Sequence, residues 1–128
     1  MLQGVSCTSA TFCTAVGFLS KGNRIEMWNG RDWRTVSSPS IPRGQWPALF
    51  GVSCRSPSDC VAVGTSSNGV AVPYPTLVVW NGRSWQYIRL PSTGPAYLAG
   101  VECRSATSCA ATGVDYSAST HPLILVMN

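Results

Sequence analysis

One short segment occurs three times in this chain with almost the same residues. Each copy contains Gly-Val, then Ser or Glu, then a cysteine, and a second cysteine follows after five more residues. The copies begin at Leu2, Leu49 and Leu98, which gives a period of 47 and then 49 residues. A period of this length indicates a repeat fold in which each copy forms one supersecondary unit. We therefore predict one domain of three repeats, at residues 2–47, 48–96 and 97–128.

The six cysteines form three pairs of identical spacing. The pairs are Cys7 with Cys13, Cys54 with Cys60, and Cys103 with Cys109. Zinc ligands are more often two to four residues apart, and the only histidine lies far along the chain from two of the pairs. We predict three local disulfides and hence an oxidising compartment, with reduced buried thiols as the alternative. No metal and no cofactor is expected.

Each repeat contains short apolar segments separated by turn residues. The segments lie near residues 2–7, 13–17, 24–28 and 33–36, and then near residues 50–54, 60–65, 76–80 and 85–90. Asn-Gly follows Trp28 and Trp80, and this dipeptide between two strand-like segments predicts a tight hairpin. No helical period is present. The last repeat stops within its third segment, so we predict four-stranded antiparallel units of which the last lacks its fourth strand.

The repeated residues carry a resemblance to a known family. Gly-Val-Ser-Cys, Cys-x-Ala-Val-Gly and Trp-Asn-Gly-x-x-Trp together resemble the disulfide-bearing β-propeller repeats of secreted bacterial proteins. The Asn-Gly turns are also distantly similar to Asp-box hairpins of sialidase-like propellers, with Trp28 and Trp80 in place of the Asp. The resemblance implies about three propeller blades, and a β-trefoil or β-prism is the alternative. Because a propeller needs at least four blades to close, we expect either self-association or further blades of the same propeller.

The repeats differ most between their second and third strands and between successive units. These segments contain five aromatic or imidazole side chains: Trp46, Tyr74, Tyr97, Tyr116 and His121. We expect these residues on loops at one face of the propeller, where they bind a protein or carbohydrate ligand. The alternative is that they cover the ends of the blade cores.

The charged residues argue against several other functions. The acidic side chains do not form a catalytic motif, and no Ser or Cys nucleophile is marked by one. One Lys and eight Arg are scattered, with a net charge of +4, which does not favour nucleic-acid binding. No apolar run reaches the length of about 18 residues that a membrane span needs. Glu102 replaces Ser6 and Ser53 on the innermost strand, where we expect it to contact a ligand or ion, or to be solvated or paired with an Arg.

These observations favour a non-enzymatic propeller module outside the cytoplasm. We expect an extracellular or cell-envelope location, although no signal peptide is visible in the chain. The first alternative is a fragment of a glycan-cleaving propeller enzyme whose catalytic residues lie in absent blades. The second alternative is a purely structural spacer.

Overall fold

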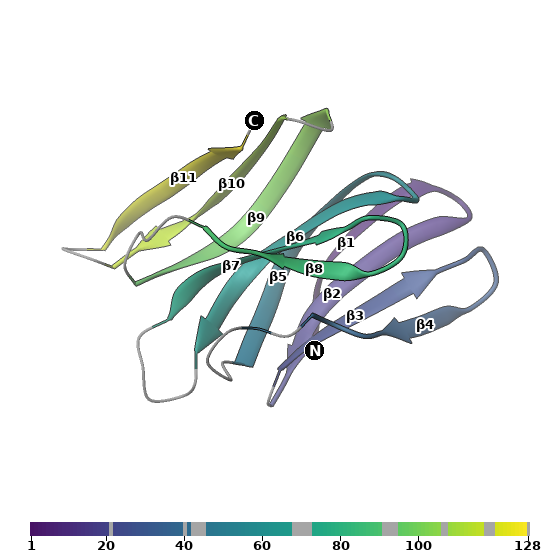
Figure 1. The fold of residues 1–128 in the computed structure, drawn as a ribbon, viewed down its shortest axis with the longest axis horizontal. Coiled ribbons are helices and arrows are strands. Elements are labelled where there is room, and N and C mark those ends of the chain that lie inside the picture. The colour runs from purple at the N-terminus through teal and green to yellow at the C-terminus, as the bar shows by residue number, and fades with distance from the viewer. Residues whose placement is uncertain are drawn as a thin grey trace.

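The structure is a computed structural model that describes residues 1–20, 22–39, 41, 46–67, 73–90, 95–105, 108–116 and 120–127. These residues form three antiparallel sheets, which are three β-propeller blades (Figure 1). Blade 1 contains β1 (Leu2–Ser9), β2 (Phe12–Leu19), β3 (Gly22–Trp28) and β4 (Trp33–Val36). Blade 2 contains β5 (Trp46–Ser56), β6 (Asp59–Ser67), β7 (Tyr74–Trp80) and β8 (Trp85–Ile88). Blade 3 contains β9 (Ala96–Ser105), β10 (Ser108–Asp115) and β11 (His121–Met127).

Each sheet is a simple meander in which consecutive strands pair. This topology confirms the predicted all-β propeller fold and favours it over the β-trefoil and β-prism alternatives. The sheets stack face to face in a fan (Figure 1), because β5 packs on β1, β2 and β3, and β9 packs on β5, β6 and β7. The first strands of the blades, β1, β5 and β9, therefore lie side by side, and we call them the inner strands.

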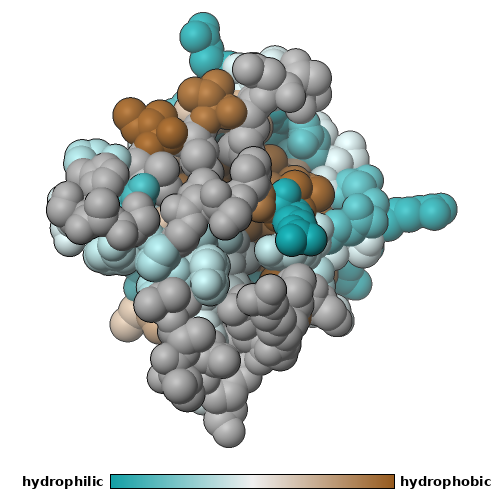
Figure 2. All heavy atoms as spheres, turned by 60° about the vertical axis from the view of Figure 1, so that its left-hand side comes forward, coloured by the Kyte–Doolittle hydropathy of each residue, from teal (hydrophilic) through white to brown (hydrophobic). Residues whose placement is uncertain are grey.

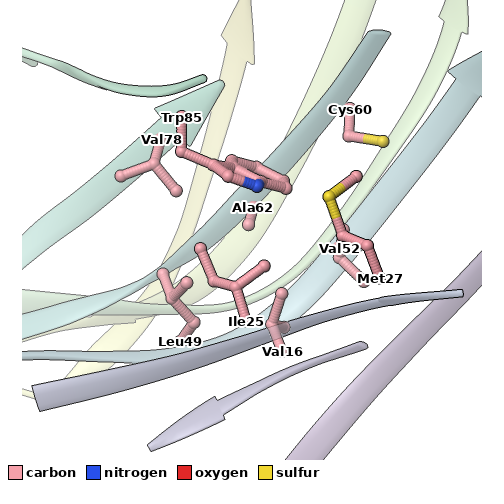
Figure 3. Close-up of a cluster of buried hydrophobic side chains, with 9 residues drawn as sticks. All are labelled: Val16, Ile25, Met27, Leu49, Val52, Cys60, Ala62, Val78 and Trp85. Atoms are coloured by element: carbon pink, nitrogen blue, oxygen red, sulfur yellow. The ribbon is translucent and has the colours of Figure 1, made fainter. Parts of the chain in front are cut away.

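The core lies between the blades. A cluster between blades 1 and 2 joins side chains of both sheets around Trp85, as Figure 3 shows. Its buried members are Val16, Ile25, Met27, Leu49, Val52, Cys60, Ala62, Val78 and Trp85. A second cluster between blades 2 and 3 contains Val61, Val63, Leu77, Leu98 and Ala111. Strand β6 of the central blade is covered on both faces, by blade 1 and by blade 3. Its sequence is therefore a continuous run of small apolar residues and does not alternate between apolar and polar ones.

The three predicted disulfides are confirmed. In each blade the two cysteines are directly opposite one another on the first two strands, with Cα atoms 4.0 Å apart. Each disulfide therefore closes the neck of a tight turn and fixes the register of the hairpin.

The glycine of Cys-x-Ala-Val-Gly is required by a close approach of two strands. A Cβ added to Gly17, Gly64 or Gly113 would lie 1.9 Å from a carbonyl oxygen of the neighbouring inner strand, at Met1, Ala48 or Tyr97 respectively. In each blade the pairing of the first two strands shifts register beside this glycine. The glycine thus lets the inner strand bulge toward its neighbour.

The Asn-Gly turns lie beside the disulfide turns. The indole Nε1 of Trp28 donates to the Ala10 carbonyl oxygen at 3.0 Å, and the indole of Trp80 donates to that of Pro57 at 3.0 Å. Both acceptors belong to the turn between the cysteines of the same blade. Gly30 and Gly82 have a φ of 95°, the left-handed region in which glycine is favoured.

Several strands are longer than the apolar segments predicted. β5 begins at Trp46 and β11 begins at His121, although both residues were expected on loops. Backbone pairing extends the strands beyond the apolar residues, since Trp46 is opposite Ser67 and His121 is opposite Asp115. Backbone hydrogen bonding thus continues each ladder past the apolar core, whatever the side chain, in the register that the core has fixed.

Candidate ligand-binding site: a row of aromatic rings

Four aromatic rings form a continuous row across the three blades. The ring centroids of Phe18 and Phe50 are 5.9 Å apart, those of Phe50 and Tyr97 are 6.1 Å apart, and those of Tyr97 and Tyr116 are 5.8 Å apart. The first two pairs meet edge to face and the third is tilted, which are favourable geometries for aromatic contacts. We call Phe18, Phe50, Tyr97 and Tyr116 the aromatic row.

The row lies at the end of the blades opposite the disulfides. Phe18 is near the end of β2, Tyr97 is near the start of β9, and Tyr116 directly follows β10. β2 and β10 run away from the disulfide turns and β9 runs toward them, so these positions share the far end of the blades. The Tyr116 N–H donates to the Pro95 carbonyl oxygen at 2.8 Å, which fixes the end of the row to the start of blade 3.

The row is half-buried along its length and opens to solvent at Tyr116. Phe18, Phe50 and Tyr97 are half-buried, whereas Tyr116 is exposed. Desolvation by neighbouring groups raises the pKa of the Tyr116 hydroxyl, and Tyr97 raises that pKa further through electrostatic repulsion and hydrogen bonding. Tyr116 is therefore a neutral phenol at physiological pH, which donates and accepts hydrogen bonds beside an apolar surface. Such a surface suits a ligand with apolar groups and a few polar ones.

The structure brings together two of the five residues predicted as ligand-binding, Tyr97 and Tyr116. Tyr74 is exposed at the start of β7 and makes no ring contact with the row. The side chains of Trp46 and His121 lie outside the described residues. The expectation that all five are loop residues was wrong, because only Tyr116 lies outside a strand.

Phe18 and Phe50 were missed by sequence reasoning. Repeat alignment compares equivalent positions, and the row crosses non-equivalent ones: Phe50 stands where blade 1 has Gln3 and blade 3 has Ala99. The signal that was available is that each of the three repeats has an aromatic residue on its first or second strand, or directly after it, although these residues are not at equivalent positions.

Two of the described acidic residues form ion pairs with arginines. Glu26 pairs with Arg24 at 3.2 Å, and Asp59 pairs with Arg55 at 3.0 Å, beside the disulfide of blade 2. Glu102 is exposed on the inner strand of blade 3. Among the described residues, no group of three His, Cys, Asp or Glu side chains is placed to hold a metal ion. Over the same residues, no helix has the length and apolar character needed to cross a membrane.

The stacked meanders with adjacent inner strands define a segment of a β-propeller. Eight chains of solved structures match this fold. One of them, described as "YCF48 bound to D1 peptide", is a β-propeller that is similar to this chain with a TM-score of 0.63 and 13% sequence identity. The match covers 94% of this chain and 39% of that chain. No protein-family model and no curated protein matches the sequence.

Proposed function

We propose that this chain is a non-enzymatic protein-binding propeller module whose ligand is a peptide segment that lies along the aromatic row. The observation that carries this proposal is the row itself, four linked aromatic rings that end in an exposed tyrosine hydroxyl. Rigid aromatic side chains bury a large area on binding at low cost in conformational entropy, and tyrosine is enriched where proteins bind one another. The peptide-bound propeller described above supports the choice of a peptide over other ligands.

The location we propose is extracellular or within the cell envelope. The three disulfides support it, since disulfides of this kind persist in oxidising compartments. In the described part of the chain, Arg24 and Arg55 pair with two of the carboxylates, which supports a binding module rather than a glycan-cleaving one.

Selection from a displayed library of random peptides, with a soluble glycan array as the second probe, tests the proposal. We expect peptides rich in apolar residues to be selected, and we expect Tyr116→Ala to weaken their binding by about tenfold, a loss typical of one interface aromatic. Tyr87→Ala is the control, because Tyr87 is a partly exposed tyrosine of β8 that lies outside the row and was not predicted to bind. Equal weakening by both substitutions, or capture of glycans alone, would contradict the proposal.

A further inference from the structure

Blade 1 presents a face that corresponds to a buried face of blade 2. We call the face of each blade that packs on the preceding blade its leading face, and the opposite one its trailing face. On blade 2 the leading face contains Leu49, Val52 and Trp85, which are buried against blade 1. Aligning the cysteines and the paired tryptophans places Leu2, Val5 and Trp33 at the same positions of blade 1. These three are exposed, Val5 to 63%.

The leading face of blade 1 is hollowed. Leu2, Val5, Ala15, Glu26 and Trp33 line a groove of about 390 Å³. At the corresponding place on blade 2, the side chains of Val16, Ile25 and Met27 from blade 1 fill the space against Trp85. The groove therefore has the position of a blade-to-blade contact that lacks the other blade.

Blade 3 presents the complementary trailing face. Ile124 is opposite Thr112, as Ile25 is opposite Val16 in blade 1. Ile124 and Val126 thus stand at the positions of Ile25 and Met27, which fill the interface between blades 1 and 2, here called the first interface. Ile124 and Val126 are 68% and 65% exposed. Figure 2, which brings the left-hand side of Figure 1 forward, shows hydrophobic residues gathered at the surface on that side of the molecule.

A polar contact between inner strands repeats with the same geometry. The Ser6 hydroxyl oxygen accepts the Cys54 N–H at 2.9 Å, and the Ser53 hydroxyl oxygen accepts the Cys103 N–H at 3.1 Å. The third member of this series is Glu102, exposed on β9, whose carboxylate is also an acceptor. In blade 1, the N–H that corresponds to those of Cys54 and Cys103 is the N–H of Cys7.

The inner strands of successive blades also approach each other closely at a glycine, in the same way at both contacts. A Cβ added to Gly4 would lie 2.9 Å from the Phe50 carbonyl oxygen, and one added to Gly51 would lie 2.9 Å from that of Ala99. At Gly100 the nearest atom is the Thr112 hydroxyl oxygen of the same blade, at 3.7 Å. The space that a neighbouring inner strand occupies in the first two cases is therefore open at Gly100.

We propose that a second copy of this chain docks head to tail, with the leading face of its blade 1 on the trailing face of blade 3. In this contact Ile124 and Val126 fill the groove beside Trp33, and the Glu102 carboxylate accepts the Cys7 N–H of the second copy. The occupant is a second copy because the two exposed faces are the two halves of a contact that the chain already makes twice within itself. The proposal does not depend on the peptide ligand, since the aromatic row is a separate surface.

Two polar replacements fall within this contact. Glu26 stands at the position of Val78, and Thr112 stands at the position of Val16, and both valines belong to the first interface. Glu26 Oε2 is buried and has no hydrogen-bond partner among the described residues. In the docked pair, the Thr112 hydroxyl of one copy is a hydrogen-bond donor in the same interface as the unsatisfied Glu26 Oε2 of the other copy. Such a donor is expected there, because buried polar groups in proteins are nearly always hydrogen-bonded.

Light scattering on a sizing column tests the proposal with the oxidised protein. We expect a concentration-dependent species of twice 13.6 kDa, or a series of larger multiples if the head-to-tail contact does not close. Val5→Lys and Ile124→Lys each place a charge in the contact, and both positions are exposed in the single chain, so both variants should fold and be monomeric. Circular dichroism and a free-thiol count check that they are folded.

Mixing the two variants distinguishes head-to-tail docking from other associations. The Val5→Lys chain keeps an intact blade 3 face, and the Ile124→Lys chain keeps an intact blade 1 face, so an equimolar mixture should recover a dimer. Glu102→Ala should weaken wild-type association by about tenfold, and Glu102→Ser should restore it, because a hydroxyl serves at the two internal contacts. A monomeric wild type at all concentrations, association that persists in both variants, or a dimer of either variant alone would overturn the proposal.

Discussion

Trp33 and Trp85 occupy the same position in consecutive blades and have opposite environments. Each follows an Asn-Gly turn, and each ring lies 5.7 Å from that of the tryptophan before the turn. Trp85 is 3% exposed because blade 1 covers it, whereas Trp33 is 47% exposed on the leading face of blade 1. A blade of this repeat therefore specifies an apolar face, and the neighbouring blade decides whether this face is core or surface.

The same contrast extends to a charge. Val78 is buried in the first interface, and its counterpart in blade 1 is Glu26, whose carboxylate is held by Arg24. A carboxylate is tolerated on the leading face of blade 1 because Arg24 pairs with one of its oxygens and no blade in the described part of the chain covers that face. To test this contrast, unfolding is measured in the Ile124→Lys background, so that no second copy covers the groove.

The largest effect is expected from exchanging the charge between the two faces. Val78→Glu buries a carboxylate in an apolar cluster without a partner, and we expect it to lower the free energy of unfolding by roughly 4 kcal/mol or more. The matched substitution Glu26→Val should change it by less than about 1 kcal/mol, because only a partly exposed ion pair is lost. Urea unfolding followed by tryptophan fluorescence measures both, and similar losses would mean that the two faces are equivalent after all.

The tryptophans themselves give the next largest difference. Trp85→Ala removes the ring at the centre of the first interface and should cost about 3 to 5 kcal/mol. Trp33→Ala removes a half-exposed ring whose described ring contact is with Trp28, and should cost about 1 kcal/mol. A loss at Trp33 as large as that at Trp85 would show that blade 1 depends on its leading face even without a neighbour.

The disulfides extend the contrast to covalent links. Removing either link releases a loop of seven residues, which corresponds to roughly 2.4 kcal/mol in the chain-entropy relation. Cys60 is also buried in the first interface, whereas Cys7 is exposed, so replacing Cys54 and Cys60 by Ala should cost more than replacing Cys7 and Cys13. Thermal unfolding of the two double variants measures the difference. A larger loss of stability for the Cys7 and Cys13 variant would mean that burial of Cys60 does not add to the stabilisation by its disulfide.

Much of the fold was predictable from the sequence because the repeat is local. Cysteine spacing, Asn-Gly turns and short apolar segments predicted the meanders, their disulfides and the three-stranded last blade. Strand ends were less predictable, since residues such as Trp46 and His121 join ladders whose register is fixed elsewhere. The difference between Trp33 and Trp85 was not predictable, because burial depends on the adjacent blade and both tryptophans follow the same motif.

The candidate site was predictable only in part for a related reason. Tyr97 and Tyr116 were singled out as aromatic residues in divergent segments, and the structure places their rings together. Phe18 and Phe50 complete the row through contacts between blades, and no spacing within one repeat encodes such a contact. The ligand-binding role of Trp46, Tyr74 and His121 stays a prediction.

The smallest effect is expected at the polar contact between inner strands. Ser53→Ala leaves the partly buried Cys103 N–H without its acceptor and should lower the free energy of unfolding by about 1 kcal/mol. Ser6→Ala should cost a similar amount, since Cys54 donates to Ser6 in the same way across the first interface. Glu102→Ala should leave the single chain unchanged, because no described strand lies beyond blade 3 to donate to it. If Glu102→Ala destabilised the monomeric background as Ser53→Ala does, Glu102 would stabilise blade 3 itself, and its place in the inner-strand series would have a different explanation.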